Sequence, residues 1–111
     1  MDEEIEVRQA VKEDLEVCVE ILSPRFKFQR NRAEEHMKEK ARLREALVAV
    51  IRGKPVGVLT YRDRFRGNNI YVEELVVAKD FQHQGVGTKL MGNLIDIGED
   101  KFRLAISLDT E

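Results

Sequence analysis

Two glycines separated by one residue, Gly85 and Gly87, stand between an apolar run and an amphipathic segment in the stretch FQHQGVGTKL. The run before them, Ile70–Ala78, is rich in β-branched residues and predicts a strand. The segment after them predicts a helix ending near Gly98, because its apolar residues recur with helical spacing (Val86, Leu90, Met91, Leu94 and Ile97). A strand, a glycine turn and a helix begin a βαβ unit, and the β-rich run Phe102–Leu108 completes it.

Strand-like runs and helical patterns follow one another along the whole chain in the order β-α-α-β-β-β-α-β. The expected strands are Ile5–Arg8, Ala46–Arg52, Pro55–Arg62, Ile70–Ala78 and Phe102–Leu108. The first expected helix runs from about Lys12 to Leu22, and the second from an N-cap at Asn31, boxed with Glu34, to about Glu45. The second helix carries many charges and only a thin apolar stripe, which predicts a position on the surface.

The connections decide how these strands are expected to pair. Glycine turns at Gly53 and at Gly67–Asn69 join the three middle strands, which are therefore expected to be antiparallel. The last two strands are joined through a helix and are expected to be parallel, with a right-handed crossover. The sequence thus predicts an α/β fold, a mixed α+β sheet with helices on its faces, formed by one domain over residues 1–111.

Composition narrows the classes of function. The net charge of −2 gives no support to nucleic-acid binding, and no apolar run approaches the length that spans a membrane. The acidic start MDEEIEV has no apolar signal core, so a cytoplasmic protein is expected. The lone cysteine, Cys18, lies on the apolar face of the first helix and is expected to be a buried structural thiol. His36 and His83 are far apart in the chain, so no metal is expected.

A glycine turn before a helix is suited to a phosphate, because backbone N–H groups can approach an anion at the helix N-terminus. The Walker A pattern fails here, since Gly87 is followed by Thr88 and Lys89 in the wrong order. The dinucleotide pattern G-x-G-x-x-G fits at its first two glycines but has Leu90 at the third position. It stays open as a weaker alternative, as does a simple tight turn. The pattern Q-x-x-G-x-G fits in full from Gln82 to Gly87.

The stretch ELVVAKDFQHQGVGTKLM, Glu74–Met91, resembles the central strand, pyrophosphate loop and helix of the GNAT superfamily of acyl-CoA-dependent N-acyltransferases, whose loop pattern is Q/R-x-x-G-x-G/A. The start IEVRQAVKEDLE, the two early helices and the hairpin are also similar to the N-terminal half of that family. The resemblance implies a GNAT-like fold, acetyl-CoA as the acyl donor, and transfer of an acetyl group to a primary amine by direct attack. The acceptor is expected to be a small-molecule or peptide amine.

The resemblance also implies which residues meet the donor. The pyrophosphate is expected on the loop and the pantetheine arm along the preceding strand, with a backbone N–H near Val76 or Val77 polarising the thioester carbonyl. The donor-binding residues implied in this way are Leu75, Val76, Val77, Gln82, His83, Gln84, Gly85, Val86, Gly87 and Thr88.

Two adjacent carboxylates on the same strand are the candidates for the general base. Glu74 is preferred over Glu73, and since neighbours on a strand point to opposite faces, only one of them is expected to face the acceptor. The alternative is that both are solvated or ion-paired strand residues. The basic segments Arg25–Arg32 and Arg62–Gly67 would suit an anionic acceptor, unless both are only solvated surface.

The sequence departs from the family near its end. Members usually continue past the strand equivalent to Phe102–Leu108 into a helix and two more strands, and a tyrosine in that helix often protonates the CoA thiolate. Tyr61 and Tyr71 lie in other elements and are not assigned that role. Three alternatives would account for this difference. The chain is a shortened form of the domain, or it forms a homodimer that completes the sheet along its exposed edge, or it is a CoA-binding or regulatory module without full catalytic machinery.

Overall fold

The computed structural model of the chain describes residues 4–64, 69–100 and 105–108. The strands are β1 (Glu6–Gln9), β2 (Ala46–Ile51), β3 (Lys54–Arg64), β4 (Asn69–Val77) and β5 (Ala105–Leu108). The helices are α1 (Leu15–Leu22), α2 (Arg30–Arg42) and α3 (Val86–Asp100), and the short 3₁₀ turns are η1 (Lys12–Asp14), η2 (Ser23–Phe26) and η4 (Lys79–Phe81). The predicted order β-α-α-β-β-β-α-β is confirmed.

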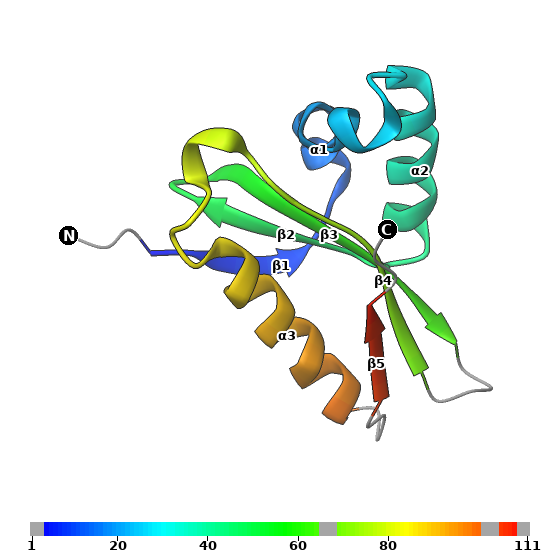
Figure 1. Ribbon diagram of the computed structural model, residues 1–111, viewed down its shortest axis with the longest axis vertical. Coiled ribbons are helices and arrows are strands. Elements are labelled where there is room, and N and C mark those ends of the chain that lie inside the picture. The colour runs from blue at the N-terminus through cyan, green and yellow to red at the C-terminus, as the bar shows by residue number, and fades with distance from the viewer. Residues whose placement is uncertain (1–3, 65–68, 101–104, 109–111) are drawn as a thin grey trace.

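The strands form one five-stranded sheet in the order β1-β2-β3-β4-β5 (Figure 1). Neighbours from β1 to β4 are antiparallel, and β4 is parallel to β5 along Asn69–Val72. Both predictions about pairing are confirmed: hairpins join the middle strands, and α3 carries the chain across to β5. The turn predicted at Gly67–Asn69 and the start of the strand predicted at Phe102–Leu108 lie partly outside the described residues.

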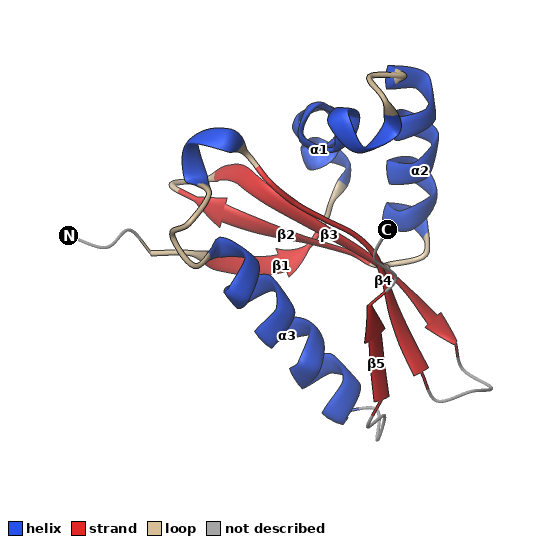
Figure 2. Cartoon of the chain, viewed as in Figure 1, coloured by secondary structure: helices blue, strands red, loops and turns tan. Residues whose placement is uncertain are grey.

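Helices cover both faces of the sheet, as predicted (Figure 2). On one face, α3 packs on the sheet through a buried cluster (Leu47, Ala49, Ile51, Val56, Leu59, Tyr61, Ile70, Val72, Val86, Leu90 and Leu94). On the other face, α1 and α2 form a second buried cluster with the opposite side of the strands (Cys18, Val19, Leu22, Ala33, Met37, Ala46, Val48, Val50 and Val58). Strands enclosed between two helical layers are apolar on both sides, which accounts for the continuous apolar run of β2. Cys18 is buried, as expected.

The start of α2 differs from the prediction. Gln29 is the N-cap, and Asn31 lies inside the first turn, so the predicted capping box is wrong. The preceding residues Lys27 and Phe28 both have left-handed backbone angles, with φ of 55° and 60°. These two residues complete a tight reversal after η2, and the helix begins as soon as the chain leaves it.

The position of α2 agrees with the prediction of a surface helix with a thin apolar stripe, and the structure adds a buried lysine to that stripe. Ala33 and Met37 belong to the second core cluster, and Lys40 is only 7% exposed. These positions recur at intervals of four and three residues, so they lie on one side of the helix while its other charges face solvent. The helix ends at Arg42 rather than near Glu45, whose N–H donates to the carbonyl of Lys40 at 2.8 Å.

A β-bulge interrupts the pairing of β3 with β4. Thr60 is paired with Glu74, whereas the next residue, Tyr61, is paired with Val72. Glu73 is therefore an extra residue that the register passes over. An extra residue bends a strand locally and changes which side chains emerge on each face.

The bulge changes which side chains of β4 point to each face of the sheet. Ile70 and Val72 pack in the cluster under α3, whereas Val76 packs in the cluster under α1 and α2. Val77 then packs with the α3 cluster. Side chains of a regular strand alternate with a period of two, so all even-numbered residues would otherwise share one face.

Candidate active site

The helix α3 begins directly after the glycine loop. Gly85 has a φ of +86°, a left-handed angle that favours glycine, and its carbonyl accepts a hydrogen bond from Lys89 N at 3.0 Å. The N–H groups of Val86, Gly87 and Thr88 therefore lie in the first turn, where a helix offers them no acceptor of its own. Together with the helix dipole, these groups suit this end of α3 to an anion.

An open cavity of about 380 Å³ lies over the loop and the end of β4. Its lining residues are Leu75, Val77, Phe81, Gln82, His83, Gly85, Val86, Gly87 and Thr88. A β-carbon built on Gly87 would meet nothing within 4 Å, so packing against the described part of the chain does not require glycine there. The two glycines thus have different roles. Gly85 is needed for its positive φ, whereas the missing side chain of Gly87 leaves open space beside the N-terminus of α3.

The donor-binding residues named from the sequence line this cavity, apart from Val76 and Gln84. Val76 packs towards α1 and α2, and Gln84 Nε2 donates to Asp80 O at 3.3 Å. Gln82 Nε2 donates to Val77 O at 3.1 Å. The Gln82 side chain thereby ties the glycine loop to the last residue of β4.

Within the part of the chain that the structure describes, the outer edge of β4 is open along its second half. β5 pairs with Asn69–Val72, and no described strand pairs with the outer edge of Glu73–Val77. This open edge runs directly into the glycine loop through η4. The loop and the edge therefore form one continuous surface that lines the same cavity.

The hydrogen-bonding pattern shows which backbone groups face this open edge. Ala78 N donates to Val56 O at 2.8 Å, so these two residues form a hydrogen-bonded pair of the antiparallel ladder. By the alternation of such ladders, Val76 directs its N–H and C=O to β3, whereas Leu75 and Val77 direct theirs outward. The contact of the Gln82 side chain with the carbonyl of Val77 agrees with that orientation.

The two candidate bases both face the layer of α1 and α2, so the expectation that they point to opposite faces is wrong. Glu73 forms an ion pair with Lys40 of α2, and Glu74 Oε2 accepts a hydrogen bond from Arg25 Nε of η2 at 2.9 Å. The bulge is the physical reason, because the extra residue breaks the alternation at this point. The Glu74 side chain is 16% exposed, and its partner Arg25 is 45% exposed.

His36 of α2 is a neighbour of this pair that sequence reasoning missed. Its Nε2 lies 3.0 Å from Thr60 Oγ1, and Thr60 is directly opposite Glu74 in the sheet. The ring of Phe26 lies against the imidazole, with 5.1 Å between ring centroids. Burial lowers the pKa of His36, and the carboxylates of Glu73 and Glu74 oppose that effect only in part. The surroundings therefore favour the neutral form of the imidazole over its protonated form.

Lys40 was missed as well, although the sequence carries a signal for it. It follows Met37 by three residues and Ala33 by seven, which places it on the apolar stripe of the helix. A lysine at such a position needs a buried acidic partner. The sequence alone does not say which of the many acidic residues supplies it.

No group of three side chains suited to a metal ion occurs within residues 4–64, 69–100 and 105–108. None of the helices in that part of the chain has the length and apolar character needed to cross a membrane.

The comparison with protein families gives a match over nearly the whole chain. The model of the acetyltransferase (GNAT) family matches residues 15–111. No curated protein sequence matches the chain.

Solved structures with the same fold include two N-acetyltransferases. The aminoglycoside N-acetyltransferase AAC(6')-Iy in complex with CoA has a TM-score of 0.80 at 16% identity, covering 100% of this chain and 80% of its own. A ribosomal-protein-alanine N-acetyltransferase from Brucella melitensis biovar Abortus has a TM-score of 0.80 at 17% identity, covering 97% of this chain and 81% of its own. A transcriptional regulator from Bacillus halodurans has a TM-score of 0.78 at 21% identity, covering 97% of this chain and 83% of its own.

The chain shares with these N-acetyltransferases a mixed sheet between two helical layers, and its glycine loop opens the helix after β4, as expected for an acyl-CoA-dependent acetyltransferase. The chain belongs to the acetyltransferase (GNAT) family, and its class of activity is that of a GNAT-type N-acetyltransferase. The resemblance inferred from the glycine loop and its surroundings is thereby confirmed.

Proposed function

We propose that the protein transfers an acetyl group from acetyl-CoA to a primary amine by direct attack of the amine on the thioester. One observation carries this proposal: the anion-binding end of α3 and the open edge of β4 line a single cavity. The acetyl-CoA donor carries a pyrophosphate and, further along, a pantetheine arm with amide groups. The end of α3 can bind the pyrophosphate, and the open edge of β4 can pair with the amides of the arm.

The loop residues act on the pyrophosphate. The N–H groups of Val86, Gly87 and Thr88 stand at the N-terminus of α3, where dipole and hydrogen bonds both favour an anion. The open space at Gly87 lets an oxygen approach the backbone closely. His83, Gln82 and the other loop residues complete the wall on the outer side.

The edge of β4 acts on the pantetheine arm and the thioester. Leu75 and Val77 direct their backbone N–H and C=O to the open edge, so an extended arm can pair with them as an added strand would. One of these N–H groups polarises the thioester carbonyl and stabilises the oxyanion that forms during attack. Val76, whose polar backbone groups face β3, supports the strand from the other side.

Glu74 is the general base in this proposal. Its carboxylate is largely buried and faces the layer of α1 and α2, whereas Glu73 is held by Lys40. As the C–N bond forms and the C–S bond breaks, CoA leaves as its thiolate with the electron pair of the broken bond, and Glu74 takes up the proton that the attacking amine loses. The acceptor is a small-molecule or peptide amine. A cytoplasmic location and a homodimer stay predictions.

Titration of acetyl-CoA in a calorimeter tests the proposal on matched glycine variants. Gly87→Glu places a carboxylate in the first turn of α3, where an added β-carbon meets nothing within 4 Å and where the helix dipole favours a negative charge. We expect wild type to bind and Gly87→Glu to lose at least about tenfold in affinity through repulsion of the pyrophosphate. Gly85→Glu is less informative, because its φ of +86° strains any side chain.

Gly92→Glu is the control. It adds the same charge to the same helix at a position that is also open, and it should bind acetyl-CoA as wild type does. Equal binding by all three proteins would overturn the loop assignment. Binding of acetyl-CoA without acetylation of any amine in a broad acceptor screen would instead favour a CoA-binding or regulatory module.

A further inference from the structure

We propose that Lys40 is a positioning residue for the acetyl donor: it holds the β-bulge at Glu73 and so determines which backbone groups of β4 face the pantetheine arm. This inference rests on the proposed function and deepens it, because it assigns part of the donor site to a residue on the far side of the sheet.

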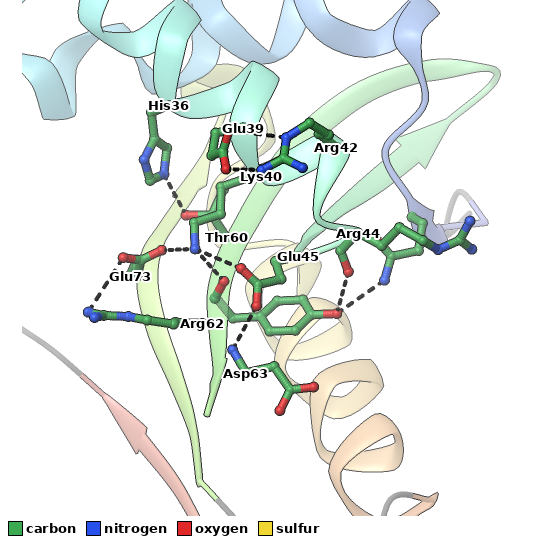
Figure 3. Close-up of polar contacts among 12 residues, drawn as sticks. His36, Glu39, Lys40, Arg42, Arg44, Glu45, Thr60, Arg62, Asp63 and Glu73 are labelled. Atoms are coloured by element: carbon green, nitrogen blue, oxygen red, sulfur yellow. Dashed lines mark hydrogen bonds and ion pairs between the residues drawn. The ribbon is translucent and has the colours of Figure 1, made fainter. Parts of the chain in front are cut away.

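Lys40 Nζ has three partners at once (Figure 3). It lies 2.8 Å from Tyr61 O and 3.0 Å from Glu45 Oε1, and it forms an ion pair with Glu73. Two of the three N–H donors of the ammonium group form hydrogen bonds, to Tyr61 O and Glu45 Oε1, and Glu73 adds the opposite charge of an ion pair. The side chains of Lys40, Glu45 and Glu73 are 8%, 14% and 24% exposed, so these contacts are weakened far less by water than a surface ion pair.

The first partner, the carbonyl of Tyr61, marks the place where the ladder between β2 and β3 stops. Tyr61 N donates to Glu45 O at 3.0 Å, as in a regular antiparallel pair. The N–H of Glu45 does not return to Tyr61 but donates to Lys40 O at 2.8 Å. Lys40 Nζ donates to Tyr61 O instead, so the lysine side chain supplies the hydrogen bond that a paired strand would otherwise give to this carbonyl.

The second partner, Glu73, is the residue that the register passes over. Pairing between β3 and β4 shifts between Thr60 and Tyr61, which is where the ammonium of Lys40 lies. Arg62 Nη2 makes a longer contact with the other carboxylate oxygen of Glu73, at 3.7 Å. Lys40 thus joins β3 to the extra residue of β4 at the shift itself, while Glu45 ties both to the start of β2.

The register beyond the bulge decides how β4 meets the donor. If the strand absorbed its extra residue, it would slip by one position, and the outward backbone groups would come from Glu74 and Val76 instead of Leu75 and Val77. The side chains would exchange faces as well, and Glu74 would leave the layer of α1 and α2. Lys40 stabilises the bulged register, because loss of its charge would leave the carboxylate of Glu73 and the carbonyl of Tyr61 without a buried partner.

Binding of two ligands separates this role from a general effect on stability. The test measures the affinity of wild type, Lys40→Met and Lys38→Met for two ligands: CoA, and adenosine 3′-phosphate 5′-diphosphate. The second ligand has the pyrophosphate but no pantetheine arm. Lys38 is the control, because it lies on the same helix and is exposed. We expect Lys40→Met to weaken CoA by about tenfold, the equivalent of one or two lost hydrogen bonds, with little change for the shorter ligand. Lys38→Met should change neither affinity.

A double variant covers the case in which Lys40→Met does not fold. Lys40→Met with Glu73→Leu removes both charges of the ion pair at the bulge, while Glu45 still accepts a hydrogen bond from the N–H of Asp63. Replacing a buried ion pair by apolar residues often keeps a protein folded. It should show the same selective loss of CoA. Wild-type affinity for CoA in either folded variant, or equal weakening of both ligands, overturns the inference. Failure of wild type to bind either ligand would overturn the proposed function itself, so the two failures are distinguishable.

Discussion

Gly57 of β3 lies directly beneath Val86, the first residue of α3: a β-carbon on Gly57 would stand 2.8 Å from Val86 Cγ1 and 3.2 Å from Leu90 Cδ1. Gly57 is also paired with Val77, the last residue of β4. The absence of a side chain at this one position therefore lets the N-terminus of α3 approach the end of β4. The two halves of the donor cavity meet at that approach.

Gly57→Ala should destabilise the protein and weaken binding of acetyl-CoA. The added methyl group overpacks the contact with Val86, at a cost of about 1–3 kcal/mol in the free energy of unfolding. Urea denaturation and calorimetric titration measure the two effects. Gly92→Ala, where the added carbon meets nothing within 4 Å, should instead stabilise α3 by about 0.5–1 kcal/mol. Equal stability of the two variants would contradict the conclusion that Gly57 lets the start of α3 pack closely on β3.

The two adjacent carboxylates should separate into different roles. Glu74→Gln removes the proposed base and should lower kcat by about 10²–10⁴ with only a small change in stability, because its partner Arg25 is well exposed. Glu73→Gln leaves Lys40 with one charged partner fewer and should lower the free energy of unfolding by about 1–2 kcal/mol. Release of CoA thiol with the best amine from a screen, together with urea denaturation, measures both. The assignment of the base would move to Glu73 if its variant alone lost turnover while keeping CoA binding.

Cys18 should be unreactive in the folded protein. Burial raises the pKa of its thiol to about 12, so almost no thiolate is present at pH 8. Reaction with Ellman's reagent should therefore be at least about 10³-fold slower than in urea, because it awaits an opening of the core. A fast reaction under native conditions would show that the layer between α1 and the sheet opens readily.

His36 should make the protein less stable in mild acid. Its folded-state pKa is lowered by burial, so between that value and the ordinary pKa of about 6.5 the unfolded chain binds more protons than the folded one. The stability that neutral His36 contributes is complete above about pH 6.5 and is lost as the pH falls through that window. Urea denaturation between pH 7 and pH 5 should show this loss in wild type and a smaller one in His36→Gln. Parallel pH dependences of the two proteins would contradict a neutral, buried imidazole. Asp14 does not affect this result: burial raises the pKa of its carboxyl, but Arg8 and the N–H of Val11 together outweigh burial and keep that pKa below its usual range.

Much of the fold follows from patterns that are local in the chain. β-rich runs bounded by glycine turns predict β2, β3 and β4 and their antiparallel pairing, because a short turn permits only that arrangement. The glycine loop predicts the start of α3, because Gly85 needs a positive φ and apolar residues with helical spacing follow it directly. The start of α2 could not be predicted in this way. The left-handed angles at Lys27 and Phe28 leave no mark in side chains that are not glycine or asparagine.

The sequence by itself determined the order of the elements, the family and the place of the glycine loop, since each depends on neighbours within a few residues along the chain. Only the tertiary structure decided that Glu73 is an extra residue in β4 and that Glu73 and Glu74 share one face. It also decided that Lys40 lies buried between Glu73 and Glu45, the residue just before β2. The physical reason is that a bulge is a property of two paired strands and a buried charge a property of its partner. For Lys40 and Glu73 that partnership joins residues more than thirty positions apart, and it forms only when the strands and α2 pack together.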